Sequence, residues 1–158
     1  MENTSTTAGS SGNAILIRNE ASNNTITYCE VRAANGNAAV NTASVTPGGI
    51  PGAIAIGTTS NLSGTGNDNI TISFCNIHST ATATLGVGIY AGNNTAVGAG
   101  GNNDNNTITG CNIYDIYLGT LASAAIDIAA GNNTYTITNN SVYQTASRIY
   151  SGTQTVRG

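Results

Sequence analysis

The sequence predicts an all-β fold in which short strands wind into a solenoid, because two phrases recur along the chain and helix signals are nearly absent. The more regular phrase occurs four times, as NTITYCEV, ITISFCNI, NTITGCNI and YTITNNSV. A single turn of chain cannot bury its own apolar face, so a unit that recurs in this way indicates stacked turns. Thr, Asn, Gly and Ile dominate, and no segment keeps a helical apolar period. We therefore predict a right-handed parallel β-helix (solenoid) of about four turns with three short strands per turn.

The first strand of each turn is predicted from the second phrase, which precedes each copy of the first. It reads AILI at 14–17, AIAI at 53–56, GVGI at 86–89 and AIDI at 125–128. Apolar residues alternate with smaller or polar ones, as a half-buried strand requires. The alternation predicts one inward face, which comprises Ile15, Ile17, Ile54, Ile56, Val87, Ile89, Ile126 and Ile128.

The T-I-T core of the first phrase predicts the second strand, and the segments EVR, NIH, NIYD and SVYQ predict the third. The middle turns contain extra loops before their T-I-T core, TSNLSGTGND and NNTAVGAGGNND, and another loop spans 33–52. Insertions at one corner, with the strands preserved, are typical of solenoids. We expect SRIY at 147–150 to begin a fifth turn.

Composition bounds the domain organisation and the partners. We expect a flexible Ser/Thr-rich segment at 1–12 and one parallel β-helix at 13–158, as a fragment of a longer solenoid. Charged residues make up only 7% of the chain and there is no Lys, so we expect no nucleic-acid partner. No run of about 18 apolar residues is present, so we expect no membrane insertion. Eight N-x-S/T sequons occur, which we attribute to chance in a chain rich in Asn and Thr.

The pattern N-N-T-I-T-x-C-x-I resembles the parallel β-helix repeats of the pectate-lyase-like superfamily. It is especially similar to Asn/Thr-rich secreted repeat proteins of Bacteroidetes-type bacteria, over about residues 13–152. The resemblance implies an extracellular or cell-surface location. Enzymes, adhesins and phage spikes all use this scaffold, so the resemblance implies the fold and leaves the activity open.

Three cysteines occupy the same place in successive repeats, and an asparagine takes that place in the fourth: Cys29, Cys75, Cys111 and Asn140. Their spacing fits neither a zinc site nor a redox motif. Stacked turns would bring them into an internal column with about 4.8 Å between neighbours. One disulfide is conceivable at that spacing, but we expect free thiols that behave as small buried apolar groups.

Alternation in the third strand predicts an outward column that contains Arg32, His78, Tyr114 and Tyr143, with Asp115 adjacent. Aromatic rings beside charged and hydrogen-bonding groups are typical of a polysaccharide-binding face. The alternative is a solvated β-surface without a ligand, because Tyr favours strands in any case. We take these five residues as the candidate ligand-binding set.

Catalysis has weaker support. The resemblance implies lyases that use Lys or Arg with calcium, or hydrolases with several close Asp residues. Here the four aspartates fall on different predicted elements: Asp68, Asp104, Asp115 and Asp127. A glycosidase needs two carboxylates that face one bond. Only Asp115 and Asp127 could approach each other, and the predicted register places Asp127 on a different face. His78 with Asp115 and Arg32 is the remaining acid–base set. The loops GTGND and GGNND carry one carboxylate each, so we expect no metal and no cofactor.

A third possibility comes from the outward residues of the T-I-T strands. They form a T-x-T column that locally resembles ice-binding solenoids: Thr25, Thr27, Thr71, Ser73, Thr107, Thr109, Thr136 and Thr138. Thr is also a common surface residue of strands in general.

These observations favour a non-enzymatic structural or adhesive segment of a secreted or cell-surface bacterial β-helix protein. Neither end of the repeat shows a recognisable cap, so we expect self-association end to end into filaments, or contact with the remainder of a longer chain. The alternatives are a polysaccharide-binding or polysaccharide-degrading module, as a lyase or glycoside hydrolase, and an ice-binding protein.

Overall fold

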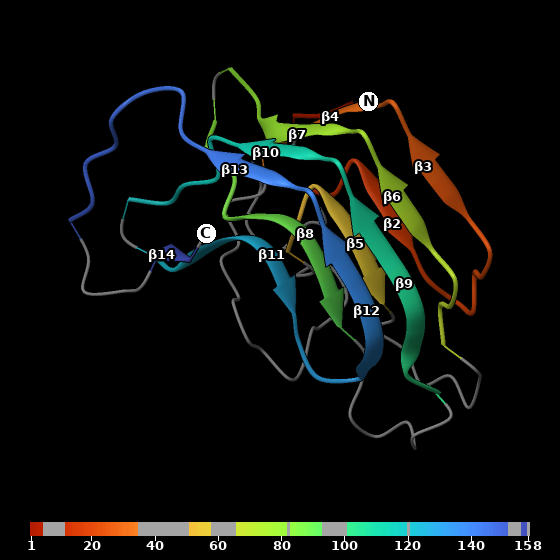
Figure 1. The fold of residues 1–158 in the computed structure, drawn as a ribbon. Helices are drawn as coiled ribbons and strands as arrows, with labels where there is room; N and C mark the ends of the chain where they lie inside the picture. Colours follow the sequence, from red (N-terminus) through yellow and green to blue (C-terminus); the bar gives the residue numbers. More distant parts are fainter. Residues whose placement is uncertain are drawn as a thin grey trace.

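The computed structural model describes residues 1–4, 12–34, 51–57, 66–81, 83–92, 101–119, 121–151 and, for the backbone, 156–157. In these ranges the chain forms β-strands and no α-helix, which confirms the predicted all-β class. The strands lie in three parallel sheets (Figure 1). None of the described residues belongs to a helix long and apolar enough to cross a membrane.

The three sheets are named A, B and C here. Sheet A has the order β1 (Glu2–Asn3), β4 (Glu30–Ala33), β7 (Asn76–Ser79), β10 (Asn112–Tyr114) and β13 (Ser141–Tyr143). Sheet B has the order β14 (Val156–Arg157), β11 (Ser123–Ile128), β8 (Val87–Gly92), β5 (Ile54–Gly57) and β2 (Ile15–Ile17). Sheet C has the order β12 (Asn132–Thr138), β9 (Asn103–Thr109), β6 (Thr71–Ser73) and β3 (Thr25–Thr27).

From β2 onward the chain visits sheets B, C and A in the same order in every circuit, and each strand pairs with its equivalent one circuit away. This arrangement is compatible with a parallel β-helix, because each circuit buries its apolar side only against its neighbours. One core cluster contains residues of all three sheets, among them Ile54, Ile72 and Ile77. Figure 1 shows β3, β6, β9 and β12 side by side in sheet C.

The T-I-T strands align as predicted. Ile26 pairs with Ile72, Ile72 with Ile108, and Ile108 with Ile137. Successive circuits are 46, 36 and 29 residues long, measured between hydrogen-bonded hydroxyl or amide side chains of adjacent turns. The predicted loops fall largely at 35–50, 58–65 and 93–100, which lie outside the described residues.

In its third copy the predicted inward face of sheet B is right for Ile89, which lies in the main core cluster, and wrong for Val87. Ile54 pairs with Ile89 and Ile56 with Ala91, so the copy is shifted by two residues. Val87 instead packs with Ala55 and Tyr90 in a second small cluster. Both faces of β5 and β8 are buried, and a strand buried on both faces reads as a continuous apolar run. Alternation therefore could not indicate which face of β8 points inward.

The two ends of the chain also differ from expectation. The segment 147–150 forms no strand, and the fifth pass through sheet B is β14, which pairs with β11. At the other end, part of the segment expected to be flexible is paired, because β1 lies parallel to β4 with Glu2 opposite Arg32. The shortness of β1 and β14 is typical of strands that close a sheet edge.

Two corners of each circuit use left-handed backbone. The corner after T-I-T holds Tyr28, Phe74, Gly110 and Asn139, with φ between 53° and 65°. The corner two residues before T-I-T holds Asn23, Asn69, Asn105 and Thr134, with φ between 54° and 60°. Asn tolerates this conformation better than most residues. The left-handed corners therefore give a backbone reason for the Asn of four sequons, at Asn23, Asn69, Asn105 and Asn139.

Thr134 is the β-branched exception at its corner, so Thr134→Asn should raise the free energy of unfolding by about 1 kcal/mol. Denaturant unfolding of the two proteins measures the difference. Thr136→Asn, two residues further along β12, is the matched control and should be neutral or slightly destabilising. Equal effects of the two substitutions would contradict the strain argument.

Candidate functional site

The predicted outward column exists as a register column of sheet A. Arg32 pairs with His78, His78 with Tyr114, and Tyr114 with Tyr143. The alternate positions point into the core, where Val31, Ile77 and Ile113 are fully buried. The placement of the column is therefore confirmed, and its role as a ligand site stays a prediction.

The rings of the column form a continuous stack. The His78 and Tyr114 ring centroids are 4.4 Å apart with an interplanar angle of 12°, and those of Tyr114 and Tyr143 are 5.1 Å apart at 14°. Parallel pairing sets this spacing, because equivalent residues of adjacent strands lie about 4.8 Å apart. Partial burial, with smaller contributions from Tyr143 and Glu30, raises the pKa of the Tyr114 hydroxyl. The hydroxyl therefore stays protonated as a hydrogen-bond donor.

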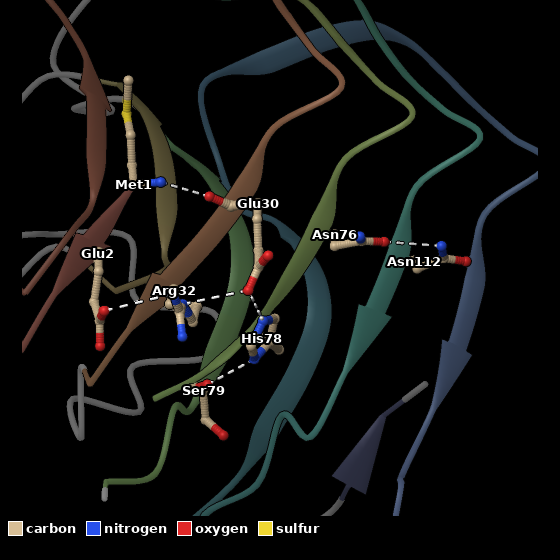
Figure 2. Close-up of polar contacts among 8 residues, drawn as sticks. All are labelled: Met1, Glu2, Glu30, Arg32, Asn76, His78, Ser79 and Asn112. Atoms are coloured by element: carbon tan, nitrogen blue, oxygen red, sulfur yellow. Dashed lines mark hydrogen bonds and ion pairs between the residues drawn. The ribbon is translucent and has the colours of Figure 1, made fainter. Parts of the chain in front are cut away.

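Charged groups gather at the end of the column nearest β1 (Figure 2). Arg32 lies 3.7 Å from the Glu2 carboxylate and 3.4 Å from that of Glu30. His78 Nε2 lies 3.4 Å from Glu30 Oε1, and His78 Nδ1 lies 2.8 Å from the Ser79 carbonyl, to which it donates. Two carboxylates therefore lie beside the Arg32 guanidinium and offset its charge, and the Met1 ammonium at the same end donates to the Glu30 carbonyl at 2.6 Å.

Asp115 follows β10, and its side chain binds the segment that follows β13. Its carboxylate accepts hydrogen bonds from the Thr145 amide (2.9 Å) and the Thr145 hydroxyl (2.6 Å). Arg148 lies 2.8 Å from the same carboxylate. Burial alone would raise the pKa of Asp115, but the bonds from Thr145 and Arg148 outweigh it and lower the pKa. We call residues 144–151 the strap.

A groove of about 560 Å³ lies between the column and the strap. Four of the five predicted site residues line it: Arg32, His78, Tyr114 and Asp115. Tyr143 extends the ring stack instead. The groove also includes Tyr117, over whose ring the Arg148 guanidinium lies at 5.9 Å. It thus combines flat rings, hydroxyls and paired charges, which suits a ligand with an apolar ring face and many hydroxyls.

Between the described residues, no hydrogen bond joins His78 to Asp115 of the predicted acid–base set, and a catalytic role for the set stays a prediction. Asp115 is engaged by the strap, whereas His78 is engaged by Ser79 and Glu30. Asp127 lies buried in β11 of sheet B, so it does not face Asp115 of sheet A across one bond. This confirms the prediction that the two carboxylates occupy different faces.

Sequence reasoning missed Glu30, Tyr117, Thr145 and Arg148. Glu30 had a readable signal, since period-two alternation places it on the same face as Arg32. The other three lie outside strands, and only the path of the chain after β10 and β13 brings them to the groove. None of the three belongs to a repeated phrase, so the sequence pattern gives no signal for them.

The internal cysteine column is a hydrogen-bonded ladder. The Cys75 thiol donates to the Ile26 carbonyl (3.6 Å) and the Cys111 thiol to the Ile72 carbonyl (3.7 Å). Asn140 makes the same contact in the fourth circuit, from its amide to the Ile108 carbonyl at 2.9 Å. The cysteines are free, as predicted. Burial raises the pKa of the Cys75 and Cys111 thiols, so they are poor nucleophiles.

The loop aspartates act within a polar ladder. The Asp104 amide donates to Asp68 Oδ1 at 2.8 Å, and the Asp68 amide donates to the Ser22 hydroxyl at 3.1 Å. Over the described ranges, no three His, Cys, Asp or Glu side chains are grouped so that they could hold a metal ion.

The outward threonines of sheet C also align as predicted. Thr27 pairs with Ser73, Ser73 with Thr109, and Thr109 with Thr138. Ser73 donates to Thr27 at 3.0 Å, and the Thr109 and Thr138 hydroxyls are also 3.0 Å apart. These hydroxyls bond to one another, which leaves fewer of them to order water. Ice binding stays a prediction.

Comparison with known proteins identifies no relative. No family model matches the chain, and neither a curated protein nor a solved structure matches it.

The strap predicts a defined pH dependence. Because the folded-state pKa of Asp115 lies below its ordinary value of 3.8, its contribution is fully present above that value and disappears as pH falls through the lower folded pKa. Asp115→Asn should therefore lower the unfolding free energy by about 1 to 2 kcal/mol at neutral pH. The difference should vanish at the acid end of a pH series of unfolding curves. A difference that is constant with pH would show that the carboxylate charge does not hold the strap.

Proposed function

We propose that this chain is a non-enzymatic structural segment of a right-handed parallel β-helix that associates end to end. The proposal places it in an extracellular or cell-surface protein of the pectate-lyase-like type, as a stalk, adhesin or filament element. The low charge, the absence of Lys and the Asn/Thr-rich repeat support that setting. The three stacked parallel sheets support the solenoid architecture.

The exposed apolar cross-section of the last circuit carries the proposal. Ile137 is 43% exposed and Val142 is 45% exposed, although their equivalents Ile108 and Ile113 one circuit below are completely buried. Covering such side chains stabilises an assembly by roughly 25 cal/mol per Å² of apolar surface. Association end to end would extend sheet A over Val142, whereas the place above Ile137, beside β12 of sheet C, needs one further strand.

Sedimentation velocity over a range of concentrations tests this proposal. Val142→Lys places a charge in the cross-section and should weaken association by about tenfold or more, because the charge would lose its water. Ser141→Lys is the matched control, since Ser141 is exposed on the same strand and Val142 is the inward neighbour. Association that is absent in the parent protein, or lost equally in both variants, would refute the proposal.

A second candidate function is polysaccharide binding by the column, which the ring stack and the adjoining groove favour. Within the stack the rings cover one another's faces, so a sugar would contact the ring edges and Tyr hydroxyls and the outer face of Tyr143 at the end of the stack. Both Arg residues that line the groove lie beside a carboxylate: Arg32 beside Glu2 and Glu30, and Arg148 beside Asp115. A neutral polysaccharide therefore fits better than an acidic one.

Retention on a set of immobilised glycans tests the second candidate. Tyr114→Ala and Tyr143→Ala should each reduce binding of a neutral glycan roughly tenfold while the far-ultraviolet β-signal is unchanged. Tyr28→Ala is the control, because Tyr28 is an exposed aromatic residue that lies outside the column. Retention of acidic glycans alone, or equal loss in the control, would count against this use of the column.

A further inference from the structure

Sheets A and B each carry one short extra strand at one end, and among the described strands sheet C carries none. The short strand β1 extends sheet A beyond β4, and the short strand β14 extends sheet B beyond β11. Among the described strands, none extends sheet C at either end, so β3 and β12 both present an unpaired edge. The order of the sheets along the chain makes the place beside β12 the next one that the coil would fill after β14.

The backbone groups that point to this place are used in every lower circuit. The amides of Tyr28, Phe74 and Gly110 donate to the strand above, as in the 3.2 Å bond from Gly110 to the Thr138 carbonyl. The carbonyls of Ile26, Ile72 and Ile108 accept from the Cys or Asn side chain above. The equivalent groups on the last circuit are the Asn139 amide and the Ile137 carbonyl, for which the described residues provide no partner.

An apolar depression accompanies these groups. A groove of about 330 Å³ is lined by residues that include Ile126, Ile137 and Val142. In sheet C the residue opposite Ile108 in the next strand is Ile137, and the two outward hydroxyls beside them bond at 3.0 Å. A strand that fits here therefore needs Ile at its centre with Thr on each side, in parallel orientation.

Direct stacking of a second copy does not fill this place. If β1 and β2 of a second copy extended sheets A and B, its β3 would lie two strand spacings, or about 9.6 Å, from β12. If β3 paired directly with β12, then β1 and β2 of the second copy would coincide with β13 and β14. One strand is therefore missing from sheet C between two stacked copies.

We propose that the edge of β12 is an acceptor site for one added parallel strand with Thr-Ile-Thr alternation, donated by a separate polypeptide segment. A backbone carbonyl of the added strand accepts a hydrogen bond from the Asn139 amide. The side chain two positions beyond its second Thr donates a hydrogen bond to the Ile137 carbonyl. Its central Ile covers Ile137. The inference rests on the proposed end-to-end association only for its biological use, because the acceptor exists in the single chain.

A synthetic peptide tests the site directly. The peptide has the sequence of residues 104–113 with Cys111→Asn, which copies the residue that Asn140 supplies, and carries a fluorophore at one end. Saturable binding to the full chain by fluorescence anisotropy is expected, with slower amide exchange at Asn139. In the folded chain the Thr107 amide donates to the Ile70 carbonyl at 2.8 Å. A peptide that also carries Thr107→Pro lacks this backbone donor and should bind about tenfold more weakly.

Protein variants complete the experiment. Ile137→Asp should abolish binding, whereas Thr25→Asp, at the opposite edge of sheet C, should leave it unchanged. No binding of the parent peptide, or equal binding of a peptide with the reversed sequence, would overturn the proposal. If the chain associates in sedimentation but does not bind the peptide, the acceptor site is wrong and the end-to-end function survives. Peptide binding without self-association would support the acceptor site and refute the end-to-end function.

Discussion

The stacking of each residue on its own equivalent, one circuit away, is the constraint on which the whole structure depends. In a parallel ladder a strand must offer its upper neighbour the same backbone groups and the same side-chain volume that it receives from its lower neighbour. The core isoleucines of sheet C satisfy this by identity, with Ile72 between Ile26 and Ile108. Asn140 satisfies it by function, because its amide reaches the same carbonyl position as the thiols of Cys75 and Cys111.

The same constraint explains how a chain with so few charges buries polar groups. The amide of Asn67 donates to Asn103 at 2.9 Å, and the amide of Asn103 donates to Asn132 at 3.0 Å. The Tyr135 hydroxyl joins this ladder at its end, where it donates to Asn132 and accepts from Asn106. Burial raises the pKa of that hydroxyl, so it remains a donor. Buried amides that bond in register satisfy one another, and ion pairs are not needed.

The parts of the fold that could be predicted from the sequence are those that belong to the repeat. The T-I-T strands, the cysteine column and the outward column of sheet A could be predicted, because an inward Ile beside an outward Thr marks both the strand and its faces. The face of β8 could not, since both of its sides are buried and apolar residues occur on each. The strap could not be predicted either, because Thr145 and Arg148 reach Asp115 across about 30 residues of chain with no equivalent in other circuits.

The unequal lengths of the circuits have a mechanical consequence. The hydrogen bonds between circuits run along the solenoid axis, so a pull on the two ends loads them directly and detaches one circuit after another. Circuits of 46, 36 and 29 residues would extend to at most roughly 160, 125 and 100 Å of free chain. Peeling from the first circuit would give steps of decreasing length, and peeling from the last would give the reverse order. A force–extension trace of a single molecule would therefore record which end gives way first.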